Sequence, residues 1–370
     1  MKALLVSGIY PPDIGGPASY IPKLSSQLAK RGFNVHVISL TDGKRFVQTK
    51  DSTKVHLIPR KIPKYIRIPL TVIAIFFHGM NADFRFANGL YEEVGIVSFI
   101  LRKKFVFKIV GDPIWERFQN SNSTRNDRTD SFKNFNIPKK FALQSTFFKW
   151  SIQGSAGVTT PGKELAEVIK ERYQIGKVTV IANGVDIPTI PNHGPYKFDL
   201  ISVSRLVPWK HVEILVEMAL KMNLSLLVVG DGPDKLKLID LASGGAGKIV
   251  FSGNLVNEQV QELLGQSRIF ALLSEYEGMS FSLLEAMAFG KRILVSNIPA
   301  NFEVIGESDF ACMVNPQNSL DLEASILELL PDSDENFRRE KAAQAWAREK
   351  FSNVTQVNQM IDYATGILND

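Results

Sequence analysis

Short runs of β-branched and other apolar residues alternate along the chain with longer segments of helical periodicity. In the first half we expect strands at Ala3–Ser7, Val35–Leu40, Phe105–Val110, Gly157–Thr160 and Val178–Ile181, with a helix at Ala18–Arg31. In the second half we expect strands at Asp199–Ser204, Leu224–Val229, Ile249–Phe251, Ile269–Leu272 and Arg292–Ser296, with helices at Val212–Lys221, Asp234–Ala242 and Asn257–Gln266. This alternation predicts parallel strands joined by crossover helices, which is an α/β fold.

The alternation is interrupted once by a segment rich in proline and turn residues, at 187–197. A chain of 370 residues also exceeds what one hydrophobic core usually organises. We therefore predict two doubly wound, Rossmann-like domains, 1–186 and 198–353, joined by the linker 187–197 and facing each other across a cleft. The last helix, 354–370, is expected to complete the first domain. In such sheets, ligands bind beyond the carboxyl ends of the strands.

Charge is distributed unevenly between the two halves. Residues 1–186 carry 28 Lys and Arg against 14 Asp and Glu, a net charge of +14, whereas residues 187–370 have a net charge of −9. This asymmetry indicates an anionic partner for the first half, namely a nucleic acid, an acidic membrane surface or a phosphorylated substrate. Solubility alone is the alternative. No recognised nucleic-acid module accompanies the charge, so we expect no nucleic-acid partner.

A membrane surface fits the charge better, because basic residues lie beside an apolar run at Ile68–Phe77. That run is about half of the roughly 20 residues needed to cross a bilayer, so peripheral contact is the expectation and a core helix beside a solvated loop is the alternative. Cys312 is the single cysteine, which excludes an intramolecular disulfide and indicates a reducing compartment. We expect a cytoplasmic protein, at the inner face of the membrane if the contact is made. The basic residues concerned are Lys44, Arg45, Lys50, Lys54, Arg60, Lys61, Lys64, Arg67, Arg102, Lys103, Lys104, Lys139 and Lys140.

Two loops that follow predicted strands carry residue types suited to phosphate. Gly15 and Gly16 precede a helix, where backbone N–H groups can approach an anion, although a plain loop is an equal alternative. Arg205 and Lys210 share the loop after Asp199–Ser204, and two cations there suit a diphosphate, with a solvated basic loop as the alternative.

A third loop, Glu275–Glu285, follows the strand at Ile269–Leu272 and runs into an apolar helix. Gly278 breaks the chain and Ser280 or Ser282 can cap the helix, so the N–H groups from Met279 to Phe281 are expected to be free for a diphosphate. Glu285 lies in the first turns of the helix and can accept from ribose hydroxyls; compensation of the helix dipole is the alternative. Glu277 precedes the cap and would face a sugar.

The glycine loop, the Arg205–Lys210 loop and the Glu277-x7-Glu285 segment resemble glycosyltransferase family 4 in order and position. That family consists of retaining enzymes of the GT-B fold. The resemblance implies that 1–186 is the acceptor domain and 198–353 the nucleotide-sugar donor domain. It assigns the diphosphate to Arg205 and Lys210, the ribose to Glu285, the transferred sugar to Glu277, and the base to the loop containing Asn254 and Leu255.

The sequence departs from the family at Gly111, where many members carry a histidine. Asp112, followed by Trp115 and Glu116, becomes the candidate on the acceptor side, and a helix-capping aspartate is the alternative.

We therefore predict a retaining glycosyltransferase that moves a hexose from a nucleotide-diphosphate sugar to a glycan or lipid-linked acceptor. Envelope polysaccharide or glycolipid synthesis would be its setting. A nucleotide-sugar epimerase or phosphorylase of the same fold, and a non-catalytic membrane-surface protein, are the alternatives. No cofactor is required, because Arg205, Lys210 and the helix N-terminus stabilise the leaving diphosphate. No metal site is expected, because the five histidines show no His-x-x-x-His spacing and Asp332-Ser-Asp334 lies beyond any strand end.

Overall fold

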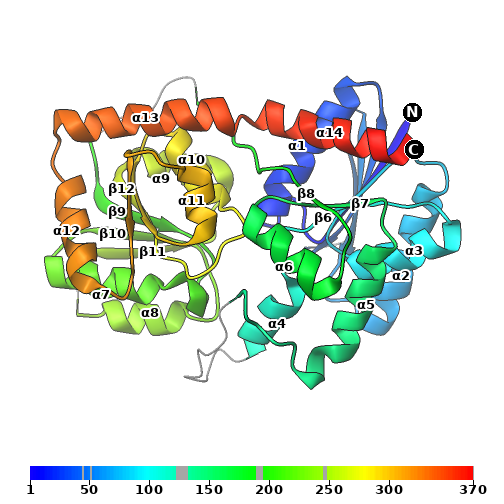
Figure 1. The fold of residues 1–370 in the computed structure, drawn as a ribbon, viewed down its shortest axis with the longest axis horizontal. Coiled ribbons are helices and arrows are strands. Elements are labelled where there is room, and N and C mark those ends of the chain that lie inside the picture. Colours follow the sequence, from blue (N-terminus) through cyan, green and yellow to red (C-terminus); the bar gives the residue numbers. More distant parts are fainter. Residues whose placement is uncertain (44–45, 51, 122–131, 189–194, 245–247, 370) are drawn as a thin grey trace. The chain divides into compact units, whose positions relative to one another are not determined.

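The computed structural model describes the chain except for residues 44–45, 51, 122–131, 189–194, 245–247 and 370, and it consists of two compact units (Figure 1). The first unit contains residues 1–116, 133–182 and 354–370. The second contains residues 117–132 and 183–353. Much of the predicted linker, residues 189–194, lies outside the described residues.

The first unit is built on an eight-stranded sheet with the order β3-β4-β2-β1-β5-β6-β7-β8. All neighbouring pairs are parallel except β3 and β4, which form an antiparallel pair at the edge. Its strands are β1 (Lys2–Ser7), β2 (Asn34–Thr41), β3 (Phe46–Lys50), β4 (Thr53–Pro59), β5 (Phe84–Asn88), β6 (Val106–Lys108), β7 (Gly157–Thr160) and β8 (Val178–Val180).

Helices follow β1, β4, β5, β6 and β7 along the chain. They are α1 (Gly16–Lys30), α2 (Lys64–Gly79), α3 (Tyr91–Leu101), α4 (Pro113–Ser121), α5 (Ala142–Gln153) and α6 (Lys163–Tyr173), with a 3₁₀ turn at Lys139–Phe141. The last helix, α14 (Asn353–Asn369), lies beside α1, and its Asp362 accepts a hydrogen bond of 2.7 Å from Arg31 (Figure 1). None of the helices in the described part of the chain is long and apolar enough to cross a membrane.

The second unit is built on a six-stranded, wholly parallel sheet with the order β11-β10-β9-β12-β13-β14. Its strands are β9 (Phe198–Val203), β10 (Leu226–Val229), β11 (Ile249–Gly253), β12 (Ser267–Leu272), β13 (Arg292–Ser296) and β14 (Ala311–Val314). Its helices are α7 (Val212–Met222), α8 (Lys235–Ala242), α9 (Asn257–Gly265), α10 (Phe281–Ala288), α11 (Pro299–Ile305), α12 (Ser319–Leu329) and α13 (Asp334–Lys350).

Helices cover both faces of this second sheet. Residues of α7, α8 and α12 pack with strand residues in one hydrophobic cluster, and α9, α10 and α13 also contact the strands. Every residue of β10 and β13 is buried, as is usual for strands that are covered on both sides. The prediction of two Rossmann-like domains is confirmed.

The polar composition of the segment 118–140 favours a surface loop, but its described ends contain structured residues. Helix α4 continues to Ser121, and Phe132 and Phe135 are each only 5% exposed. The Phe132 ring stacks on Tyr276 of the second unit at a centroid distance of 3.8 Å. Two aromatic anchors were therefore missed because they are isolated in the sequence and give no periodic signal.

The Asp332-Ser-Asp334 sequence is typical of a turn and helix cap, and Asp332 has a further role that the sequence did not reveal. It accepts hydrogen bonds from Arg268 and from Arg292, which is fully buried, and Ser333 caps α13. These hydrogen bonds lower the pKa of the Asp332 carboxyl despite partial burial. The Asp332-Ser-Asp334 sequence is thus an arginine partner and a helix start.

Candidate functional site

In the second sheet, the connections between successive strands reverse direction at β9. β9 lies between β10 and β12, so the chain leaves β9 toward one edge and later returns on the other side through β12. The loops after β9 and β12 diverge at such a point and leave a crevice at the carboxyl ends of the strands. These two loops carry Arg205, Lys210, Glu277 and the start of α10.

The loop after β9 is held in shape by its own sequence. Pro208 begins a 3₁₀ turn that ends at Lys210, and Trp209 within it is buried. The backbone oxygen of Trp209 accepts a hydrogen bond of 2.8 Å from the N–H of Glu275, which joins this loop to the one after β12. The Arg205 side chain is exposed and has no ion pair within the described residues.

Lys210 and Glu277, which were predicted separately, form a direct ion pair. Glu277 is 8% exposed and also accepts a hydrogen bond of 2.7 Å from the hydroxyl of Ser274. A nearly buried carboxylate is costly unless it is paired, and Lys210 and Ser274 supply the partners of Glu277 at this edge of the sheet.

The N-terminus of α10 has the predicted cap. Ser280 accepts a hydrogen bond of 3.3 Å from the N–H of Leu283 and lies 2.9 Å from the hydroxyl of Ser282. Within the described chain, the N–H groups of Met279, Phe281 and Ser282 have no intramolecular acceptor. They form a donor group at the positive end of the helix dipole.

The other residues predicted for this site lie directly before α10, on α10 itself, or in the loop after β11. Gly278 precedes the cap, and Met279 is held by Asn183, which donates a hydrogen bond of 3.1 Å to its backbone oxygen. Glu285 is half-buried on α10. Asn254 and Leu255 follow β11 beyond Gly253, whose backbone oxygen accepts a hydrogen bond of 2.9 Å from Gly230.

Two glycines after β10, Gly230 and Gly232, allow the loops of the site to pack closely, and the sequence analysis gave them no role. A Cβ on Gly230 would lie 1.9 Å from the backbone oxygen of Ser204, and a Cβ on Gly232 would lie 2.2 Å from that of Leu206. Only glycine allows the loop after β10 to pack this closely on the loop that carries Arg205. The Gly-Asp-Gly-Pro sequence directly after a buried strand could have indicated this close packing.

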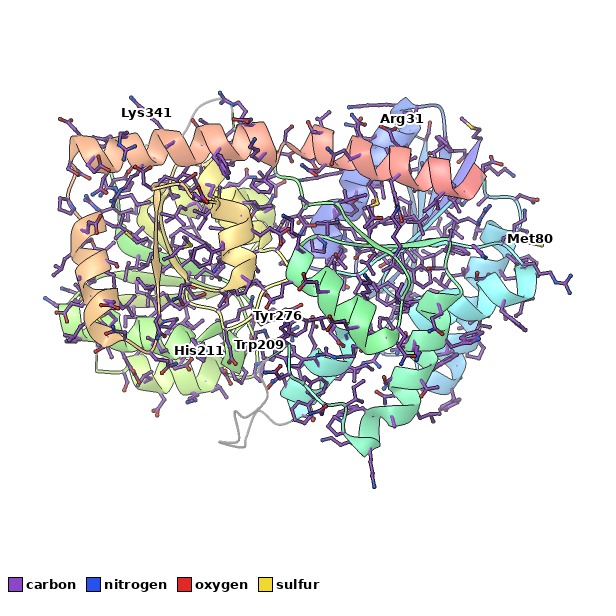
Figure 2. The ribbon with its side chains drawn as sticks, viewed as in Figure 1. Arg31, Met80, Trp209, His211, Tyr276 and Lys341 are labelled. Carbon is purple, nitrogen blue, oxygen red and sulfur yellow. The ribbon has the colours of Figure 1, made fainter. Side chains whose placement is uncertain are left out.

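His211 is a second residue that sequence reasoning missed. Its ring nitrogens lie 3.3 Å from Glu213 and 3.6 Å from Glu275. Burial disfavours the charged ring, but the hydrogen bonds to the two carboxylates outweigh burial and raise the pKa of His211 to about 9. His211 therefore connects the loop that carries Lys210 to the loop that carries Glu277, and Figure 2 shows it near Trp209 and Tyr276.

In the first unit, the glycine loop lies at the equivalent reversal, because β1 is placed between β2 and β5. Gly15 has a φ of +149°, and a Cβ there would lie 2.6 Å from Ile9, so this position requires glycine. Helix α1 begins at Gly16 without a side-chain cap.

Asp112 is fully buried, and its contacts are those of a structural residue. It accepts hydrogen bonds from the N–H groups of Ile114 and Trp115, from the Tyr173 hydroxyl at 2.8 Å, and from Arg172 in an ion pair. The helix-capping alternative accounts for the two backbone contacts, and the contacts with Tyr173 and Arg172 join Asp112 to α6. Trp115 is buried and Glu116 half-buried on α4, so their acceptor role stays a prediction.

Two strand ends of the first unit instead present buried polar groups that the sequence analysis did not select. Asn88 ends β5 next to β1 and is 2% exposed, and neither its amide nitrogen nor its amide oxygen has a hydrogen-bond partner among the described residues. Lys108 ends β6, is fully buried, and lies 4.6 Å from the Tyr20 ring centroid. Burial lowers the pKa of Lys108 to about 7. The sequence could have indicated both residues, because each is a polar residue at the last position of an apolar strand.

Comparison with known proteins agrees with this architecture. An uncharacterized glycosyltransferase of Methanocaldococcus jannaschii is 21% identical over 385 residues, which cover 95% of both chains. Another from the same organism is 24% identical over 189 residues, 51% of this chain and 53% of the relative, so the chain matches about half of that protein. The structure of Anabaena HepE in complex with UDP and glucose is similar with a TM-score of 0.76 at 18% identity, covering 99% of this chain and 100% of HepE.

The fold of two Rossmann-like units is therefore shared with HepE. Residues 187–346 match the family described as Glycosyl transferases group 1. Most of the second unit is therefore similar to this glycosyltransferase family.

The close packing at Gly232 predicts a specific loss of stability. Gly232→Ala places a Cβ against backbone that cannot move cheaply, so we expect the free energy of unfolding to fall by about 1–3 kcal/mol. Gly244→Ala is the matched control, because a Cβ there would have no neighbour within 4 Å in the described part of the chain. Thermal unfolding should separate the two variants; equal stabilities would show that the loop after β10 adjusts freely.

The raised pKa of His211 predicts that the stability of the protein depends on pH. Its folded pKa of about 9 lies above the ordinary value of 6.5, so its stabilisation is fully present below pH 6.5 and is lost as the pH rises through 9. His211→Asn removes the charge while tolerating the φ of 49° at this position. The stability difference between wild type and variant should be at most about 3 kcal/mol near pH 6 and should shrink toward pH 9.5. A difference that is constant with pH would mean that the ring is uncharged.

Proposed function

We propose that the chain is a retaining glycosyltransferase that transfers a hexose from a nucleotide-diphosphate sugar to a hydroxyl of a glycan or lipid-linked acceptor. The observation that carries the proposal is the convergence of Lys210, Glu277 and the free N–H groups of α10 where β9 and β12 diverge. HepE, which shares the fold, was solved with UDP and glucose, and this supports a nucleotide sugar as the donor class.

Departure of the diphosphate is the step that these residues suit best. Breaking the bond between the sugar and the diphosphate leaves negative charge on the phosphate oxygens. The N–H groups of Phe281 and Ser282, Lys210 and the exposed Arg205 would stabilise that charge from fixed positions. Because these cations supply the counter-charge, the proposed reaction requires no divalent metal for this role.

The Lys210–Glu277 pair gives the site two states. Without a donor, Lys210 neutralises Glu277. When a diphosphate arrives, Lys210 would share its charge with the phosphates, and Glu277 would accept hydrogen bonds from hydroxyls of the transferred sugar. The acceptor hydroxyl would then attack on the face that the leaving group vacates, which retains the anomeric configuration.

The remaining roles follow from position. Glu285 would accept hydrogen bonds from the ribose hydroxyls, and the backbone around Asn254 and Leu255 would contact the base. On the acceptor side, the unpartnered amide of Asn88 is a group that a sugar hydroxyl could satisfy, since an unpaired buried amide is costly. Asp112 has no free oxygen for such a role.

A donor panel tests the proposal. Sugars linked to uridine, guanosine and adenosine diphosphate are titrated against thermal stability, and release of free nucleotide is then measured with and without a lipid-linked acceptor. Release that depends on the acceptor supports a transferase. Donor consumption without an acceptor would indicate an epimerase or phosphorylase, and no binding of any donor would indicate a non-catalytic protein.

Lys210→Ala should weaken donor binding by about 10–100-fold, because a charge-assisted contact contributes about 1.5–3 kcal/mol. Glu285→Ala should also weaken donor binding, through loss of the ribose contact. Glu277→Gln should lower kcat more than it raises KM. Calorimetric titration and steady-state rates distinguish these effects.

Lys221→Ala is the matched control, because Lys221 is an exposed lysine that pairs with Glu323 on the surface. It should bind the donor like wild type. Unchanged affinity in Lys210→Ala would remove the diphosphate role, and unchanged affinity in Glu285→Ala would remove the ribose role.

We also propose that the first unit rests on an anionic membrane surface, where a lipid-linked acceptor would be found. Helix α3 packs on α2 and on α5, and each of the three exposes large apolar side chains. Phe99 and Trp150 lie 6.1 Å apart between ring centroids, which joins the exposed faces of α3 and α5. We call this set the apolar face: Tyr65, Ile66, Ile73 and Phe77 on α2, Phe99 and Ile100 on α3, and Leu143, Phe147 and Trp150 on α5.

Basic residues occur on the same elements, at Lys64 and Arg67 on α2, at Arg102–Lys104 after α3, and at Lys139–Lys140 before α5. Apolar side chains beside cations suit an interface with acidic headgroups, since each cation near such a surface adds about 1 kcal/mol. An apolar face of this kind is also uncommon on proteins that bind nothing there.

Phe99→Glu should reduce binding to vesicles that contain acidic lipids, because it places a carboxylate in the apolar face, where Phe99 is 73% exposed. Leu236→Glu is the matched control, since Leu236 is 80% exposed on α8 of the other unit. Sedimentation with acidic and zwitterionic vesicles measures the effect. Equal loss in both variants, or no preference for acidic vesicles, would contradict the membrane proposal.

A further inference from the structure

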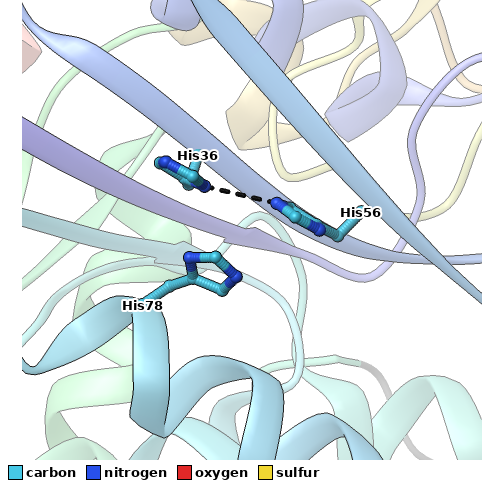
Figure 3. A group of neighbouring side chains, drawn as sticks. All are labelled: His36, His56 and His78. Carbon is cyan, nitrogen blue, oxygen red and sulfur yellow. Dashed lines mark hydrogen bonds between the residues drawn. The ribbon is translucent and has the colours of Figure 1, made fainter. Parts of the chain in front are cut away.

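Three histidines that are far apart in the sequence meet on one face of the first sheet (Figure 3). His36 lies on β2, His56 on β4, and His78 in the last turn of α2. The parallel register pairs His36 with Lys54 and Ile38 with His56, so His36 and His56 project from the same face. Helix α2 packs on both strands and brings His78 to them.

The ring nitrogens are spaced as ligands of one metal ion. Nδ1 of His36 lies 3.2 Å from Nε2 of His56, and one nitrogen from each of the three rings lies within 4.8 Å of the others. In a tetrahedral zinc site with Zn–N bonds of about 2.0–2.1 Å, ligand nitrogens are about 3.3 Å apart. The first pair already has that separation, and small rotations of the half-buried His78 ring would complete the set.

Local electrostatics favour the neutral imidazole, which is the form that binds metal. Burial, the two neighbouring rings, Lys54 and Lys2 lower the pKa of His36 to about 4, and burial and Lys54 lower that of His78. The two lysines oppose a cation, whereas the carbonyl end of α2 favours one at His78. The alternative to a metal site is a stack of neutral rings with one hydrogen bond between His36 and His56. The His36–His78 and His56–His78 ring centroids are each 4.5 Å apart.

We propose that His36, His56 and His78 bind one zinc ion, with water as the fourth ligand. Each imidazole would give the lone pair of one nitrogen and keep its proton on the other, as His36 Nδ1 and His56 Nε2 already face each other. His36 is the third residue of β2 and His56 the fourth residue of β4, so the cluster lies away from the carboxyl ends of these strands. The ion would therefore link the C-terminal turn of α2 to β2 and β4 and stabilise their packing.

The test uses the full-length protein after chelation and dialysis. Co²⁺ is titrated as a spectroscopic substitute for Zn²⁺, and we expect one ion per chain with the strong visible absorption of a four-coordinate site. Zn²⁺ should displace it, raise the Tm, and slow amide exchange in the last turn of α2. His36→Gln and His78→Gln should each weaken Co²⁺ binding by at least about 10-fold, as loss of a ligand requires.

Three further variants separate a metal site from a stack of rings. His56→Phe keeps an aromatic ring but no ligand, so it should lose metal binding and keep the metal-free Tm. Lys54→Gln removes an opposing charge and should tighten binding several-fold. His211→Asn removes a histidine of the other unit and should bind Co²⁺ like wild type.

The proposal is overturned if Co²⁺ binds below one equivalent at millimolar concentration. It is also overturned if binding persists undiminished in His36→Gln and His78→Gln, or if the spectrum is that of six-coordinate cobalt with most ligands from water.

Discussion

The position of β9 between β10 and β12 is the constraint on which the rest of the second unit depends. Parallel strands align their carboxyl ends at one edge, so every functional loop of the sheet emerges there. The loops after β9 and β12 diverge at this reversal, and the loop after β10 closes on them through Gly230 and Gly232. The Arg205 loop can occupy its place only because those two positions lack a Cβ.

Charges at this edge are already paired within the protein. Lys210 pairs with Glu277, and His211 lies between Glu213 and Glu275. These contacts hold the loops after β9 and β12 in register before any ligand arrives, so little reorganisation would be needed on binding. The exposed Arg205 and the free N–H groups of α10 are the parts of the site that an anion can reach without displacing a partner.

The first unit follows the same topological rule with different chemistry at its edges. Gly15 and Asn88 lie where the strand connections of its sheet reverse direction, and the Asn88 amide has no partner among the described residues. Asp112, which the sequence analysis selected instead, caps α4 and pairs with Arg172. Helix α2 connects two other features, since one side carries exposed apolar residues and its last turn carries His78.

The sequence by itself determined the α/β alternation and the loops that carry Arg205, Lys210, Glu277 and the Ser280 cap, because each depends on local periodicity and on residues near a strand end. Contacts between distant segments were decided by the tertiary structure alone. The ion pair of Lys210 with Glu277, the burial of Asp112 and the meeting of His36, His56 and His78 all require strand order and register. Spacing along the chain carries no information about which strands become neighbours, so these residues could be named from the sequence but not placed together.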